Sequence, residues 1–277
     1  MSDLAPLETL YEAEQGNALP LPAALEHLYG PLHFPSGGRH VIGNYVSTLD
    51  GVVALGVPGH ASGGAISGSN RHDRFVMGLL RAAADVVITG AGTLRASPDH
   101  LWTADHINPK LSKPYDELRS ELGKSGPPLN VIVSGSGTLD ADFRVLRPGK
   151  VPVMVITTAA GKAKLGEGKL SSAVEVVVAG DGKLSASAVL AAAAPDEGII
   201  LLEAGPRLMA DFIAERLLDE LFLTISPQIA GRDGSTERPG FVAGKQFAPW
   251  DPRWGTLVSV RRGGSHLFLR YSFGSKP

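Results

Sequence analysis

Carboxylates that follow predicted strands are the first candidates for chemistry in this sequence. Glu203 directly follows Gly198–Leu202, a short apolar stretch typical of a buried strand. A carboxylate placed there needs a partner or a ligand, because burying an unpaired charge is costly. Asp50 follows the β-branched stretch 40–48 and precedes Gly51. It could therefore cap a turn, or face a pocket as a substrate ligand or proton relay.

Arg81 stands near the end of a predicted helix over residues 69–84, which Ser69 or Asn70 could cap. A cation in the last turn complements the helix dipole. The same guanidinium could instead hold an anionic substrate. The sequence leaves both roles open.

Glycines mark two strand-to-turn junctions, VITGAGT at 87–93 and LLEAGP at 201–206. Glycine lets the backbone approach a ligand closely, and exposed N–H groups there favour a phosphate oxygen. In open α/β sheets, ligands bind where strands end. The alternative is that these glycines only make tight turns. The first junction is not the G-x-G-x-x-G fingerprint, because Arg95 holds its sixth position.

Composition excludes several kinds of chemistry. The chain has no cysteine and no H-x-E spacing, so we expect no metal site of the zinc type. No G-x-S-x-G elbow is present, and residues 135–137 predict only a loop. A net charge of −2 with scattered basic residues argues against nucleic-acid binding. Apolar stretches are far shorter than the roughly 20 residues of a membrane span, and residues 1–20 do not read as a signal peptide. We expect a soluble, cytoplasmic protein with a small-molecule substrate and no membrane partner.

The elements that position these residues alternate between short apolar strands and helices. This pattern predicts an α/β fold with a mixed, mostly parallel sheet covered by helices on both faces. A C-terminal antiparallel hairpin is predicted over 255–273, turning at Gly263 and Gly264. We expect an N-terminal extension, 1–39, packed on a single domain, 40–277. Within these, 4–28 predicts one or two short surface helices, 49–67 a loop, and 96–128 a long surface excursion.

Taken in order, the motifs resemble the reductase domain of the riboflavin-pathway deaminase–reductases, in a stand-alone form. The matching segments are TLDG at 48–51, LR at 80–81, AD at 84–85, GAGT at 90–93, EAGP at 203–206, LDEL at 218–221 and ISP at 225–227. The deaminase half of that family needs a zinc site with two cysteines. A chain without cysteine cannot carry it, so deamination is excluded.

The resemblance implies a dihydrofolate-reductase-like fold, a homodimer, and NADPH bound across the carboxyl edge of the sheet. It implies reduction of a phosphoribosylamino-pyrimidine to its ribitylamino product by hydride transfer to the sugar C1. Asp50 and Glu203 would be catalytic, and Arg81 would bind substrate with them. Separately from the resemblance, Arg95 is our candidate for contact with the cofactor 2′-phosphate. The implied cofactor-binding residues are Val46, Gly90, Gly92, Thr93, Gly205, Pro206, Arg207 and Leu208.

Departures from the family pattern keep other functions open. Ala204 replaces a glycine, Ala65 stands roughly where a tryptophan is expected, and residues 96–98 replace an acidic pair. The arginine expected after Pro98 to hold the substrate phosphate has no counterpart. One alternative is an NADPH-dependent reductase of a pterin, folate or other small heterocycle. Another is a non-catalytic nucleotide-binding protein of the same fold.

Overall fold

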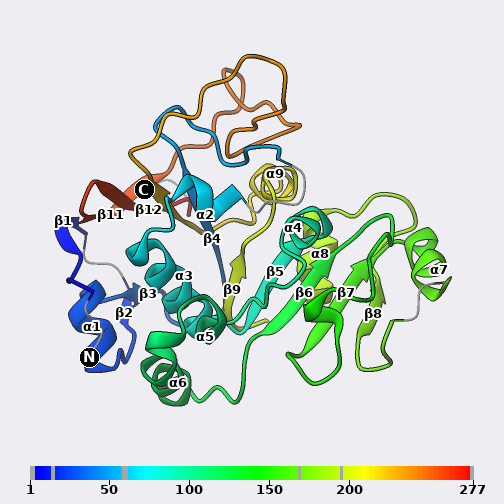
Figure 1. Cartoon of the computed structure of the whole chain (residues 1–277), viewed down its shortest axis with the longest axis horizontal. Helices are drawn as coiled ribbons and strands as arrows, with labels where there is room; N and C mark the ends of the chain where they lie inside the picture. Colours follow the sequence, from blue (N-terminus) through cyan, green and yellow to red (C-terminus); the bar gives the residue numbers. More distant parts are fainter. Residues whose placement is uncertain (1–3, 14–15, 58–61, 168–169, 194–195, 275–277) are drawn as a thin grey trace.

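The computed structural model describes residues 4–13, 16–57, 62–167, 170–193 and 196–274. One large sheet forms the centre of the molecule (Figure 1). In spatial order its strands are β1 (Glu8–Glu12), β11 (Thr256–Gly263), β12 (His266–Ser272), β10 (Glu220–Ile225), β4 (Arg39–Ser47), β9 (Gly198–Leu202), β5 (Val86–Gly90), β6 (Leu129–Val133), β7 (Val153–Thr157) and β8 (Glu175–Val178).

The strands from β10 to β8 are parallel, whereas β12, β11 and β1 continue the sheet antiparallel. The central strands are apolar on both faces. Val87 and Leu201 pack into one core, whereas Ile88 and Leu202 pack into the other. This is the burial expected for parallel strands between two helical layers. The predicted mixed α/β sheet with a C-terminal hairpin is therefore confirmed.

Helices cover both faces of the sheet. The first core includes side chains from α1 (Ala23–Tyr29), α3 (Arg71–Ala83), α6 (Ser112–Glu121) and α7 (Ala159–Glu167). The second core includes side chains from α8 (Ala186–Ala193) and α9 (Pro206–Ala214). Shorter elements complete the described chain: β2 (Asn17–Ala18), β3 (His33–Phe34), α2 (Ser62–Ile66), α4 (Ala91–Ala96), α5 (Ala104–Ile107), η1 (Pro109–Leu111) and η2 (Arg144–Leu146). Within the described residues, no helix has the length and apolar character needed to cross a bilayer.

The N-terminal segment differs from the prediction of surface helices. Residues 8–12 form the edge strand β1, which pairs with β11, and only α1 is helical before β3. Thr9 and Tyr11 suit a strand, and the partner edge is formed by residues about 250 positions later in the chain. Arg261 ties the segment down through Glu12, at 2.6 Å, and through the carbonyl oxygen of Tyr29, at 2.7 Å. Pairing with the distant strand β11 therefore makes residues 8–12 a strand and not a helix.

Residues 96–128 also differ from the prediction, because they do not simply cross the surface. They contain α5, η1 and α6, and they bury Leu101, Trp102, Tyr115 and Leu118 in the first core. The prediction counted prolines and charges and overlooked these apolar side chains. Similarly, the predicted loop 49–67 contains the short helix α2.

One edge of the sheet brings together the carboxyl ends of β4, β9, β5 and β6. The irregular segment 226–255 lies beside the chain that leaves β4, at the top of Figure 1. Backbone hydrogen bonds join the two segments, from Leu49 N–H to the Gln228 carbonyl (2.8 Å) and from Val53 N–H to the Pro239 carbonyl (3.0 Å). This edge carries the candidate site.

Candidate active site

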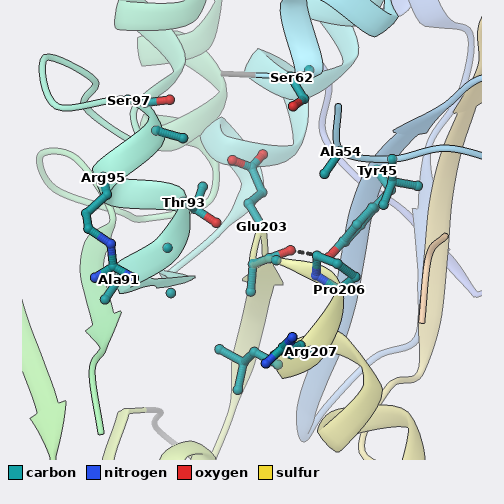
Figure 2. A pocket seen from close by; sticks show the side chains of 18 of the residues that line it. Tyr45, Ala54, Ser62, Ala91, Thr93, Arg95, Ser97, Glu203, Pro206 and Arg207 are labelled. Atoms are coloured by element: carbon teal, nitrogen blue, oxygen red, sulfur yellow. Dashed lines mark hydrogen bonds between the residues drawn. The ribbon is translucent and has the colours of Figure 1, made fainter. Parts of the chain in front are cut away.

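A cleft of about 1050 Å³ opens at the carboxyl edge of the sheet. Every predicted site residue except Asp50 lines it, including Val46, Arg81 and Arg95. Figure 2 shows the Glu203 side chain projecting between Thr93 of α4 on one side and Ala54 on the other. In the described part of the chain, no three acidic, histidine or cysteine side chains are grouped so that they could hold a metal ion.

The two glycine-bearing junctions meet in this cleft. They follow adjacent strands, because β5 pairs with β9 so that Ile88 lies opposite Leu202. A Cβ built on Gly205 would lie 3.8 Å from the Thr93 hydroxyl oxygen. A Cβ on Gly90 would meet nothing within 4 Å. The backbone of both junctions is thus open to a ligand.

Helix α9 begins at the second junction, with Gly205 as its N-cap and Pro206 in its first turn. The first N–H groups of a helix have no acceptor within it and carry a partial positive charge, which suits a phosphate. Arg207 and Leu208 supply such groups and line the cleft. Tyr45 holds the turn in place, because its hydroxyl donates to the carbonyl oxygen of Ala204 (Figure 2).

A third strand end contributes to the cleft and was not predicted to do so. Ser134, Gly135 and Ser136 follow β6 and line the same cavity. The hydroxyl oxygen of Ser134 is buried and has no hydrogen-bond partner in the described structure. The sequence signal was a polar, glycine-bearing segment after an apolar strand, the same pattern as at the other two junctions. The interpretation of 135–137 as a loop only is therefore incomplete.

Arg81 and Glu203 form a buried ion pair in the cleft wall. Arg81 Nη2 and Nε lie 2.7 and 3.1 Å from Glu203 Oε2, and the two side chains are 2% and 8% exposed. Arg81 also donates to the carbonyl oxygen of Thr103 at 3.2 Å. The second carboxylate oxygen, Oε1, accepts from Asn44 Nδ2 at 3.2 Å. Arg81 is thus largely occupied in orienting Glu203, and Glu203 is the carboxylate presented to the cleft.

Asp50 was predicted to face the substrate, and the structure places it elsewhere. Its carboxylate accepts hydrogen bonds from the Thr48 hydroxyl (2.6 Å) and from the backbone N–H groups of Ala230 (3.1 Å) and Gly231 (2.8 Å). The Thr48 hydrogen bond and these backbone donors lower the pKa of Asp50. The carboxylate joins two loops and does not line the cleft, so the turn-capping alternative describes it better.

Asp73 is a cleft residue that the sequence analysis missed. It lies in the first turn of α3, where an acidic residue is expected for helix stability alone, so nothing in the sequence singled it out. Its side chain is buried, with the residue 7% exposed, and it lines the cleft. Burial raises its pKa to about 6, although hydrogen bonds with the Thr224 and Ser67 side chains oppose the shift.

Aromatic rings form the cleft wall where an arginine was expected after Pro98. His100 and Trp102 line the cavity, and their ring centroids lie 4.9 Å apart. His106 packs edge-on against His100 at 4.6 Å. Burial, together with the charge of Arg81, lowers the pKa of His100 to about 2, so its ring is uncharged at neutral pH.

Comparison with known proteins identifies the family and the fold. The RibD C-terminal domain family matches residues 39–266. A pyrimidine reductase-like protein from Corynebacterium diphtheriae has a TM-score of 0.66 at 21% identity, covering 86% of this chain and 92% of that one. The riboflavin biosynthesis reductase Rib7 of Saccharomyces cerevisiae has a TM-score of 0.54 at 14% identity, covering 86% and 90%.

A Thermotoga maritima deaminase/reductase gives a TM-score of 0.58 at 21% identity, and the match covers 85% of this chain but only 56% of that one. At these identities the solved structures establish a shared fold. No curated protein sequence matches the chain. The family match spans most of the sequence, and the chain belongs to the RibD C-terminal domain family.

Proposed function

We propose that this protein is an NADPH-dependent reductase that acts on 5-amino-6-(5-phosphoribosylamino)uracil. The observation that carries the proposal is the convergence of three strand ends and the Arg81–Glu203 pair on one cleft. Membership of a reductase family supports the class of reaction. The residues that line the cleft support the proposed substrate and cofactor.

The residues at the strand ends fit a dinucleotide. An added Cβ would find open space at Gly90 and only the Thr93 hydroxyl near Gly205, so both backbones admit close approach. The buried Ser134 hydroxyl lacks a partner that a ligand oxygen would supply. The first turn of α9 would hold the phosphates with Thr93. Arg95, which also lines the cleft, would meet the 2′-phosphate.

When bound, NADPH supplies a hydride. The protein's own contribution is to orient the substrate and to handle a proton. Glu203, fixed by Arg81 and Asn44, can accept hydrogen bonds from an amino-substituted ring. The exposed Arg74 lines the same cleft and can pair with the substrate phosphate, in place of the arginine missing after Pro98.

A second candidate is reduction of a pterin, folate or other heterocycle without a phosphate. The uncharged His100 ring and Trp102 favour it, since such a wall stacks on a flat ring and offers no charge to a phosphate. The two candidates share the cofactor and the reaction class. They differ in the substrate group beside His100, which is a phosphoribosyl group in the first candidate and a flat ring without a phosphate in the second.

Turnover with two substrates tests the proposal. Purified protein should oxidise NADPH with 5-amino-6-(5-phosphoribosylamino)uracil, and Arg74→Ala should raise KM for this substrate by about tenfold, the loss of one phosphate pair. Faster oxidation with dihydrofolate, unaffected by Arg74→Ala, would favour the second candidate. Absence of oxidation with both substrates would indicate a non-catalytic protein.

A further inference from the structure

Asp73 is an acid in the cleft, and none of the described residues forms an ion pair with it. Its backbone N–H donates to the helix cap Asn70, and its carboxyl group is hydrogen-bonded to the Thr224 and Ser67 side chains. The charged groups that face it are Glu203, which disfavours its ionisation, and Arg74, which favours it weakly.

The hydrogen bond to Thr224 places the Asp73 carboxyl group beside the sheet. Thr224 on β10 lies opposite Val46 on β4, and both Val46 and Asp73 line the cavity. Glu203 approaches the same space from the end of β9. Asp73 therefore belongs to the part of the cleft assigned to the substrate and the nicotinamide. The part assigned to the phosphates is formed by the end of β6 at Ser134 and by the first turn of α9.

The two cleft carboxyl groups have opposite environments. Glu203 is paired with the buried Arg81 guanidinium, with Nη2 2.7 Å from Oε2. Asp73 has no such cation, and burial disfavours its charge. Paired carboxyl groups with contrasting surroundings divide acid and charged roles in enzymes. Here Glu203 is engaged by Arg81 and Asn44, and Asp73 is the carboxyl group left to act as an acid.

We infer that Asp73 donates the proton that accompanies reduction of a C=N bond in the substrate. The inference rests on the proposed reductase function. The substrate carbon gains a hydride from the reduced nicotinamide, and its nitrogen gains the Asp73 proton as the C=N π bond breaks. New C–H and N–H bonds form, the nicotinamide becomes oxidised, and the Asp73 carboxylate takes a proton from water before the next turnover. Both candidate substrates offer a C=N bond, one of them in the open-chain form of its sugar.

Single-turnover rates with NADPH and 5-amino-6-(5-phosphoribosylamino)uracil or dihydrofolate test this inference. The wild-type rate should fall about tenfold per pH unit above the pKa of Asp73, as a required acid dictates. Asp73→Asn should lower the rate by about a hundredfold or more and abolish this dependence. Thr224→Val should move the dependence to higher pH, because the Thr224 hydrogen bond lowers the pKa of Asp73. The exposed Asp116 on α6 offers a matched control, since Asp116→Asn should change neither rate nor profile.

A ligand-free measurement examines the acid itself. Carbon NMR of the aspartate carboxyl groups should show one resonance that titrates near pH 6 and is absent from Asp73→Asn. Asp73→Asn that turns over as fast as wild type, or a titration in the usual aspartate range, would overturn the assignment of Asp73 alone. A wild type inactive with both substrates would instead overturn the reductase function, and the proton step with it.

Discussion

Arg81 and Glu203 lie 122 residues apart in the chain, and they meet as a two-bonded ion pair, Nη2 and Nε on Oε2, in the cleft wall. Arg81 comes from the end of α3, and Glu203 directly follows β9. The pair links the helix that covers one face of the sheet to the strand end that carries the EAGP junction, residues 203–206. Because both side chains are buried, each one needs the other to neutralise its charge.

Removing one partner of this pair should lower the free energy of unfolding more than removing both partners. Arg81→Met leaves the Glu203 carboxylate buried without its cation, and we expect a loss of about 3–5 kcal/mol in the free energy of unfolding. Arg81→Met combined with Glu203→Gln should recover a large part of that loss. Urea denaturation at neutral pH measures both. Equal losses in the single and double variants would show that the ion pair is not what Arg81 stabilises.

Glu203→Gln should separate substrate handling from cofactor binding. Loss of a charge-assisted hydrogen bond to the substrate should lower kcat/KM by about 10- to 100-fold. The affinity for NADPH should stay close to that of wild type, because the proposed phosphate-binding residues are at the glycine junctions. Exposed Glu117 provides the control, as Glu117→Gln should alter neither quantity. Parallel loss of turnover and NADPH affinity would make Glu203 a structural residue.

Gly205→Val should weaken NADPH binding. Gly205 has φ −65°, which valine can adopt, so the effect would come from side-chain bulk beside Thr93. We expect Kd to rise by about tenfold or more, equivalent to at least 1.4 kcal/mol, in a fluorescence titration. Gly182→Val is the matched control, since a side chain there meets nothing within 4 Å. Unchanged affinity in Gly205→Val would remove this junction from the cofactor site.

Asp73 should make the protein less stable as the pH rises. Its pKa is raised to about 6 in the folded protein from an ordinary value of 3.8, so the unfolded chain loses this proton first. The penalty is absent below the unfolded pKa, grows between the two values and is complete above the folded pKa. Relative to wild type, Asp73→Asn should therefore gain up to about 3 kcal/mol of stability from acidic to neutral pH. Urea unfolding across this range measures the difference, and a constant difference would contradict the prediction.

Asp50→Ala should loosen the irregular segment beside the cleft. The change removes the acceptor for the Ala230 and Gly231 N–H groups, next to Arg232. We expect trypsin to cleave after Arg232 faster than in wild type, with Asp140→Ala, a change in another exposed loop, as the control. Mass spectrometry of a digestion time course would measure this. Unchanged digestion together with lost turnover would return Asp50 to a direct catalytic role.

The sequence by itself determined the sheet and the edge that carries the cleft. Apolar runs such as Gly198–Leu202 specify buried parallel strands because no polar face is left for solvent. Glycines at the ends of two such runs predicted that Gly92 and Gly205 lie on the same rim, and both line the cleft. These features are local in the chain, so spacing and residue type are enough to reveal them.

Only the tertiary structure decided which polar residues share the cleft. Asp50 and Asp73 are both acidic residues beside a strand or helix end, yet one bonds to a neighbouring loop and the other is buried beside Thr224. Likewise, Glu8–Glu12 became a strand because the distant β11 offers it an unpaired edge. Burial and partner choice depend on contacts between residues far apart in sequence, and these contacts set hydrogen bonding and pKa. Such long-range contacts cannot be inferred from the local pattern of a single sequence.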